Sequence, residues 1–171
     1  MRDTILIDRG SCYACPIRCK RVVEVDDQDY SVDPQYGGPE YETVGSFGSN
    51  CGIDDIRAVA AANELCNAYS VDTISTGMMV SFAMECYENG LLTREDTGGL
   101  DLSFGNAKEM VELTRMICER EGIGDLAWTV FEDDALERRL DLIRRMMEDV
   151  KETGVQDANT FVQSMMEQIS P

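Results

Sequence analysis

The chain has 171 residues and carries 33 acidic against 15 basic side chains, a formal net charge of −18 at pH 7. A chain of this length predicts one compact domain or slightly more. The charge argues against a surface that binds nucleic acid or an anionic membrane. The sequence contains seven cysteines and no histidine. It therefore excludes Ser-His-Asp and Cys-His catalysis, and every histidine-ligated metal site, within these residues.

The sequence also bears on the compartment. No stretch reaches the roughly 18 apolar residues that a membrane helix needs. The first ten residues contain four charged side chains and only a short apolar run at 5–7, which is not the pattern of a signal peptide. We therefore expect a cytoplasmic protein with no membrane partner. In a reducing cytosol, seven thiols indicate metal ligands and buried apolar cysteines rather than a disulfide framework.

Residues 1–52 lack the periodicity of long regular elements. Residues 1–21 hold three cysteines and five basic side chains, and residues 22–52 are acidic and rich in glycine, proline and tyrosine. Glycine and proline limit regular structure, although residues 22–25 favour a short strand before the turn at Asp26 and Asp27. We expect an irregular, cysteine-containing loop region over 1–52 with at most a short hairpin.

Helical periodicity begins at residue 53 and favours a mainly α, helical bundle-like domain. Asp54 or Asp55 is the expected N-cap of the first helix, and Thr73 or Ser75 opens the second. The second helix is apolar nearly all round, which predicts that it is central in a larger core. The predicted helices cover about 54–69, 73–89 and 106–121 in a core at 53–126, and about 132–152 and 157–169 in a tail at 127–171.

Cys12, Cys15 and Cys19 form a C-x2-C-x3-C group, in which a turn allows three sulfurs to converge on one point. Four interpretations are open: a buried apolar trio or incidental spacing, a redox pair of Cys12 and Cys15, a zinc site and an iron–sulfur cluster. Zinc would need a fourth ligand without any histidine. All-thiolate ligation suits an iron–sulfur cluster, and nearby arginines and lysine would offset its negative charge. We therefore favour the cluster.

Such a cluster needs a fourth ligand, which would be Cys51, Cys66, Cys86, Cys118 or a residue outside this chain. Three of these, Cys66, Cys86 and Cys118, lie on apolar helix faces. A small buried thiol is the simpler interpretation of a cysteine in that setting. We expect these three to be core residues.

Residues 37–43 place Glu40, Tyr41 and Glu42 on a loop stiffened by Pro39. Beside a cofactor, such a loop could hold a glutamate whose pKa is raised by burial for proton transfer. Without a cofactor, it is a solvated acidic turn. The glycine-rich segment 45–52 leads into the first helix and could present backbone N–H groups to an anion, although no complete phosphate-binding motif accompanies it.

A series of short segments runs in order from the cysteine group to residue 126. They are CYACPIRCK at 12–20, GPEYET at 38–43, SNCGIDD at 49–55, NELCN at 63–67, DTISTG at 72–77, FAME at 82–85, GLL at 90–92, LDL at 100–102, FGNA at 104–107 and GIGDL at 122–126. Together they resemble the aldehyde ferredoxin oxidoreductases, which are tungsten, occasionally molybdenum, bis-pyranopterin enzymes. From about residue 127 onward we find no resemblance.

The resemblance implies roles for five residues before the helices. Cys12, Cys15 and Cys19 would be three of the four ligands of a 4Fe–4S cluster, which relays electrons between the pterin and ferredoxin. Tyr41 and Glu42 would lie beside the metal. Glu42 would accept a proton, and Tyr41 would donate a hydrogen bond to the substrate oxygen.

The resemblance also implies a pterin-binding segment at 67–72, where the family has a D-x-x-G-L-D motif. Asn67 and Asp72 would be its cofactor-binding residues. Only Asp72 is retained, since Asn67 replaces the first aspartate and Ser70 replaces the glycine.

The activity implied by the resemblance is the oxidation of small aldehydes to carboxylic acids at the tungstopterin, with electrons leaving through the cluster to ferredoxin. The family's N-terminal pterin domain, its fourth cluster cysteine and an active-site histidine have no counterpart here. We therefore expect an internal segment, inactive alone, that needs the missing remainder of the enzyme or a complementary subunit. A stand-alone iron–sulfur electron-transfer subunit and a cofactor-free helical interaction fragment remain open as alternatives.

Overall fold

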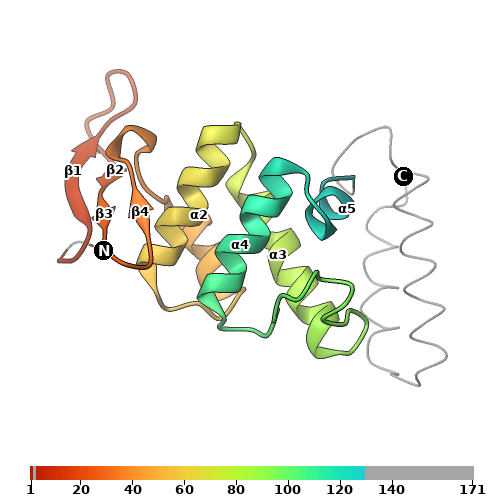
Figure 1. Cartoon of the computed structure of the whole chain (residues 1–171). Coiled ribbons are helices and arrows are strands. Elements are labelled where there is room, and N and C mark those ends of the chain that lie inside the picture. The colour runs from red at the N-terminus through yellow and green to blue at the C-terminus, as the bar shows by residue number, and fades with distance from the viewer. Residues whose placement is uncertain (2, 130–171) are drawn as a thin grey trace. The chain divides into compact units, whose positions relative to one another are not determined.

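The computed structural model describes Met1 and residues 3–129, and two small antiparallel hairpins open the chain (Figure 1). Strand β1 (Leu6–Gly10) pairs with β2 (Lys20–Val23), and β3 (Val25–Asp26) pairs with β4 (Ser31–Val32). The strand expected over 22–25 is thus divided between β2 and β3. Strand β1 escaped prediction because its three central residues are all exposed, so it lacks the alternation of a half-buried strand.

Helices make up most of the remaining regular structure, which confirms the mainly α fold. The described residues up to Ala127 form one compact unit. In chain order the helices are η1 (Pro34–Tyr36, a 3-10 turn), α1 (Tyr41–Thr43), η2 (Val44–Ser49, a π-helix), α2 (Ile56–Tyr69), α3 (Thr73–Glu88), α4 (Ala107–Glu119) and α5 (Ile123–Thr129).

Helix α2 lies at the centre of this unit and contacts α3, α4, η1, η2 and β4 (Figure 1). It begins where the carboxylate of Asp55 accepts a hydrogen bond from the backbone N–H of Arg57 at 2.9 Å, and it ends at Ser70 in the left-handed conformation. Every residue from Ala58 to Asn63 is buried. Small alanine side chains allow neighbours to approach α2 from all sides, so this half of the helix is enclosed.

The helix predicted at 73–89 was expected to be central in a larger core. Helix α3 buries one face, including Val80, Ala83 and Met84, but Ile74 and Met78 are 45% and 51% exposed. The helix begins at Thr73, one of the two predicted starts. There the carboxylate of Asp72 accepts a hydrogen bond from the backbone N–H of Ser75 at 2.7 Å. The helix predicted at 106–121 is α4, which buries Met110, Leu113, Thr114, Ile117 and Cys118 along one face.

The π-helix η2 replaces the glycine-rich loop that the sequence predicted. Backbone hydrogen bonds from Asn50 to Gly45 (3.0 Å) and from Ile53 to Gly48 (2.9 Å) span five residues each. Phe47 points into the core and is fully buried. Glycines disfavour a helix in isolation, so tertiary packing of this segment overrides its local preference.

The close approach of η2 to α3 depends on Gly77. A Cβ atom at this position would lie 2.7 Å from both Cβ and Oγ of Ser46 and 3.0 Å from its carbonyl carbon. Such separations are far below van der Waals contact, so only glycine allows α3 to pack directly on η2.

Ion pairs connect the second hairpin to the helices. Arg57 on α2 contacts Asp27 at 2.9 Å, and Lys108 on α4 contacts Asp29 at 2.8 Å. These pairs are partly exposed, so each contributes little to stability, but both fix the hairpin turn against the helical layer.

Two further expectations concern the C-terminal tail and a membrane-spanning helix. The tail at 127–171 with its helices at 132–152 and 157–169 lies outside the described residues, apart from 127–129. None of the helices in the described part combines the length and the apolar character that a bilayer span requires.

We predict that Gly77→Ala destabilises the fold by about 1–3 kcal/mol, because the new methyl group overlaps Ser46. Gly45→Ala is the matched control, since a Cβ there meets no atom within 4 Å. It should leave stability unchanged or raise it by about 0.5–1 kcal/mol. Urea denaturation followed by circular dichroism measures both variants, and equal stability of the two would contradict the packing described for η2 and α3.

Candidate functional site

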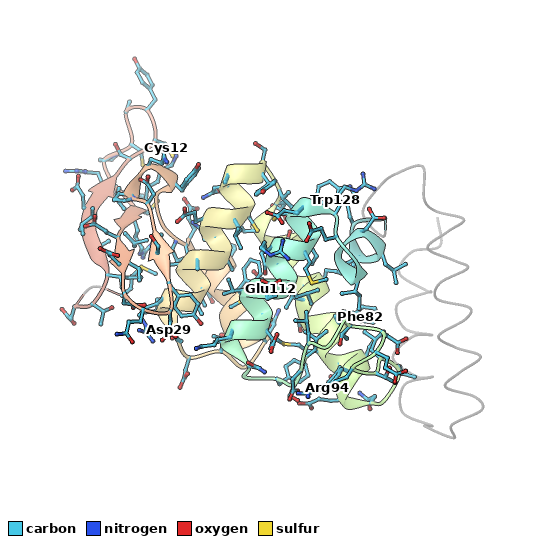
Figure 2. The ribbon with its side chains drawn as sticks, in the orientation of Figure 1. Cys12, Asp29, Phe82, Arg94, Glu112 and Trp128 are labelled. Carbon is cyan, nitrogen blue, oxygen red and sulfur yellow. The ribbon has the colours of Figure 1, made fainter. Side chains whose placement is uncertain are left out.

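The loop between β1 and β2 carries the three clustered cysteines. Cys12 and Cys19 are exposed and Cys15 is half-buried. The backbone N–H of Cys15 donates to the carbonyl of Cys12 at 3.1 Å, which closes a turn across the first pair. Figure 2 shows Cys12 beside the hairpins, on the opposite side of the helices from Phe82. The loop therefore presents its thiols outward and does not pack them into the core, so the buried-trio interpretation is wrong.

Arginine side chains donate hydrogen bonds to backbone carbonyls at both ends of this loop. The guanidinium of Arg18 donates to the carbonyl of Arg9, and Arg21 donates to the carbonyl of Cys19 at 3.0 Å. Ala14 and Arg18 adopt the left-handed backbone conformation, which is uncommon for residues other than glycine. Such sharp local turns are what a short segment needs to direct several side chains to one side.

The loop does not present a preformed metal site. Among the described residues, no three or more His, Cys, Asp or Glu side chains are arranged to hold a metal ion. The donor chemistry nevertheless fits an iron–sulfur cluster, since all three available ligands are accessible thiols with cations nearby.

The other four cysteines are buried among the helices, as the sequence predicted for Cys66, Cys86 and Cys118. Burial raises the pKa of Cys51 to about 12 and that of Cys86 to about 12. Cys66 and Cys118 share a hydrogen bond that raises the pKa of the first thiol and lowers that of the second. Cys51, once a candidate fourth ligand, donates to the carbonyls of Ser46 and Gly77 inside the core.

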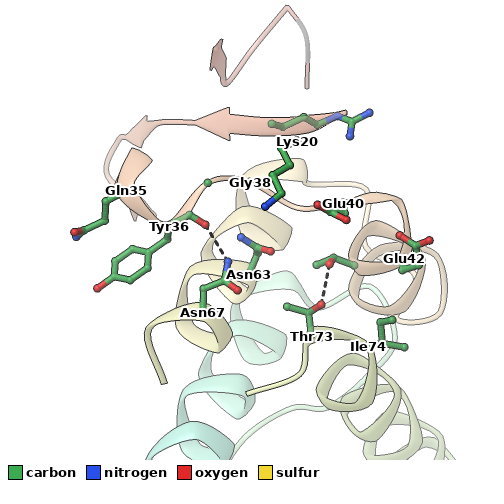
Figure 3. Close-up of a pocket in the computed structure, with 13 residues that line it drawn as sticks. Lys20, Gln35, Tyr36, Gly38, Glu40, Glu42, Asn63, Asn67, Thr73 and Ile74 are labelled. Atoms are coloured by element: carbon green, nitrogen blue, oxygen red, sulfur yellow. Dashed lines mark hydrogen bonds between the residues drawn. The ribbon is translucent and has the colours of Figure 1, made fainter. Parts of the chain in front are cut away.

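A cavity of about 690 Å³ lies where the first hairpin, α1, α2 and α3 meet (Figure 3). Its polar lining includes two cations next to the cysteine loop, two carboxylates and several amides. The lining residues are Lys20, Arg21, Gln35, Tyr36, Gly37, Gly38, Glu40, Glu42, Thr43, Asn63, Asn67, Thr73 and Ile74.

Two of the four predicted catalytic and cofactor-binding residues, Glu42 and Asn67, line this cavity. Glu42 is exposed in the described part of the chain. The α1 turn that carries it is tied to α3 by a hydrogen bond of 2.9 Å between the hydroxyls of Thr43 and Thr73. Tyr41, which is 83% exposed, is not among the lining residues.

The two predicted pterin-binding residues also have structural roles. Asp72 is occupied as the N-cap of α3 and does not line the cavity. Asn67 donates from Nδ2 to the carbonyl of Tyr36 at 2.9 Å, which fixes η1 against α2 (Figure 3). An aspartate at position 67 would have no N–H to donate there.

Sequence reasoning missed Lys20 and Asn63 as site residues. Lys20 follows the last clustered cysteine directly, but only the pairing of β2 with β1 and the packing of the hairpin place it at the cavity. Asn63 is buried, at 4% exposure. Only the packing of α2 beneath the cavity shows that this buried amide forms part of the cavity wall.

Comparison with known proteins tests the resemblance to a family that the short segments indicated. Residues 1–130 match the family described as "Aldehyde ferredoxin oxidoreductase, domains 2 & 3". The chain belongs to the aldehyde ferredoxin oxidoreductase family. It is 39% identical over 132 residues to the tungsten-containing aldehyde ferredoxin oxidoreductase of Pyrococcus abyssi, an alignment that covers 74% of this chain and 20% of the relative. The family resemblance inferred from the short segments is therefore confirmed.

More distant relatives carry other names. The chain is 32% identical over 114 residues to a Pyrococcus furiosus protein named "Aliphatic sulfonate oxidoreductase, WOR-like subunit", covering 67% of this chain and 18% of the relative. A solved BamBC complex of benzoyl coenzyme A reductase matches with a TM-score of 0.57 and 25% identity, covering 73% of this chain and 18% of that one. The chain thus spans about a fifth of the length of these relatives.

We predict that stability falls as pH rises, in part through Cys51. Its folded-state pKa of about 12 lies above the ordinary value of 9.0, so the unfolded chain releases this proton first. Its contribution is complete below about pH 9 and is lost as the pH rises toward 12, at up to about 1.4 kcal/mol per pH unit. Urea unfolding at about pH 8.5, 9.5 and 10.5 measures the slope.

Cys51→Ala should give a shallower slope than the unmodified protein, because the titrating thiol is gone. Cys12→Ala is the control, since its thiol is exposed, and it should keep the original slope. If Cys51→Ala has the same pH slope as the unmodified protein, burial of this thiol does not govern the loss of stability.

Proposed function

We propose that this chain forms the cluster-binding and helical part of an enzyme that oxidises aldehydes to carboxylic acids. In the complete enzyme the reaction takes place at a tungsten, or molybdenum, bis-pyranopterin, and a 4Fe–4S cluster passes the electrons to ferredoxin. The relatives named as tungsten-containing aldehyde ferredoxin oxidoreductases support this proposal. We also propose a cytoplasmic location, in keeping with reduced thiols in the cysteine loop.

One structural observation carries the proposal. The last cysteine of the loop, Cys19, is followed directly by Lys20 and Arg21, which line the same cavity as Glu42. A group held by the loop would therefore lie beside a polar cavity large enough for a cofactor or substrate. Electron transfer and proton transfer would be served by neighbouring parts of one site.

The residues of this chain would have the following roles. Cys12, Cys15 and Cys19 would supply three thiolates to the cluster, and a ligand outside the described residues would supply the fourth. Tyr41 would donate a hydrogen bond to the substrate oxygen, and Glu42 would accept the proton released on oxidation. When bound, the pterin-held metal supplies two-electron oxidation and the cluster supplies one-electron transfer.

The chain covers about a fifth of its relatives, so we propose that turnover requires additional protein. That protein would be the remainder of the enzyme or a complementary subunit, and it would cover Tyr41 and Glu42 and complete the pterin site. The outward position of the cysteine loop also favours a second candidate function, an iron–sulfur electron-transfer subunit that acts with a partner.

Anaerobic reconstitution with iron and sulfide tests the cluster. The unmodified chain should become brown and hold about four irons, whereas Cys15→Ser should lose the absorption near about 400 nm and most of the iron, because one of three thiolate ligands is removed. Cys86→Ala is the matched control. Its thiol is buried in α3, so iron content should stay unchanged.

A colourless protein with seven titratable thiols would overturn both cluster functions and favour a cofactor-free interaction fragment. Loss of iron in Cys86→Ala, with circular dichroism unchanged, would overturn the ligand assignment. Aldehyde oxidation by the reconstituted chain without added protein would contradict the requirement for a remainder or partner.

A further inference from the structure

Asn63 is a buried amide without a partner at the wall of the cavity. The residue is 4% exposed and lies in the middle of α2. Across Met1 and residues 3–129, its side chain makes no hydrogen bond, whereas Asn67, one turn later on the same helix, donates to Tyr36. Figure 3 shows the Asn63 amide among the cavity-lining side chains.

An amide that is 4% exposed and makes no hydrogen bond to another described residue is unfavourable, because the protein supplies no bond in place of those the amide makes to water in the unfolded chain. The unpaired donor and acceptor of Asn63 are therefore available to a molecule that enters the cavity. A carboxamide presents a donor and an acceptor side by side, which matches a flat ring bearing an adjacent acceptor and donor.

The charged groups around the cavity indicate what else such a molecule carries. Lys20 extends from β2 toward Asn63 (Figure 3), and its ammonium group has no ion-pair or hydrogen-bond partner within the described part of the chain. Arg21 contributes a second cation. Glu40 and Glu42 line the cavity at the α1 turn. An anionic substituent would therefore be favoured near β2 and disfavoured near α1.

We propose that Asn63 recognises the ligand of this cavity by a paired hydrogen bond to the edge of a flat heterocycle, and that Lys20 binds an anionic substituent of the same molecule. Both a pterin and a purine nucleotide carry such an edge and such a charge. The proposal deepens the proposed function, on which it rests for the assignment of this cavity to the catalytic site.

Two probes distinguish a pterin from a purine nucleotide as the ligand of the cavity. Pterin-6-carboxylate and guanosine monophosphate both offer an adjacent donor and acceptor with an anion, and benzoate offers a flat ring and an anion without that edge. Binding to the full chain is measured by fluorescence or calorimetric titration up to about 1 mM. We expect one of the first two probes to bind saturably, and Asn63→Leu to weaken it by roughly tenfold or more. Lys20→Ala should weaken the same probe, whereas any binding of benzoate should not depend on Asn63.

Thermal unfolding of the empty protein is the second measurement. Asn63→Leu should raise the Tm by roughly 3 °C or more, because it removes an unpaired polar group from the core. The matched control is Asn106→Leu. The amide of Asn106 donates to the carbonyl of Asp101 at 2.9 Å, so the control should lower the Tm and leave probe binding unchanged.

The results separate this proposal from the proposed function. If the unmodified chain binds neither heterocyclic probe, if Asn63→Leu binds as well as the unmodified chain, or if Asn63→Leu is less stable, the role of Asn63 is overturned. Iron content after reconstitution is measured on the same samples. Normal iron with failed probe binding would leave the cluster function intact, and loss of iron would overturn the proposed function.

Discussion

The packing of η2 directly on α3 is the constraint on which the geometry of the site depends. Gly77 allows the two backbones to approach, and the buried thiol of Cys51 donates to carbonyls of both segments. The hydroxyl contact between Thr43 and Thr73 continues this junction to the α1 turn. Through these contacts the position of Glu42 is determined by the helical core rather than by the loop that precedes it.

Basic and acidic side chains line different parts of the cavity. The chain is strongly acidic, yet its first 21 residues hold five of its 15 basic side chains. Lys20 and Arg21 bring two of them to the cavity, beside the cysteine loop. Thiolate ligands and a cluster would add negative charge at this point, and the cations reduce the cost of gathering that charge. The carboxylates at the α1 turn lie at another part of the same cavity.

Local sequence signals predicted much of the helical core and less of the site. Asp55 and Thr73 marked two helix starts, and helical spacing located α4. The π-helix was missed, because Gly45 and Gly48 indicate a loop unless burial of Phe47 and the contact with Gly77 are known. The cavity joins five separate segments of the chain, so no short window of sequence could place Lys20 over Asn63. The resemblance located the cysteines and Glu42, but not the structural duties of Asn67 and Asp72.

The π-helix also determines how the preceding α1 turn is rotated about the helix axis relative to α3. A π turn holds one residue more than an α turn, and each residue of an α-helix turns the chain by about 100°. Removal of one residue from Val44–Ser49 would restore α-helical hydrogen bonding and improve its local energy. The same deletion would rotate the α1 turn relative to α3 by about that angle and carry Glu42 away from the cavity wall. The wide turn thus preserves the direction of the Glu42 carboxylate toward the cavity.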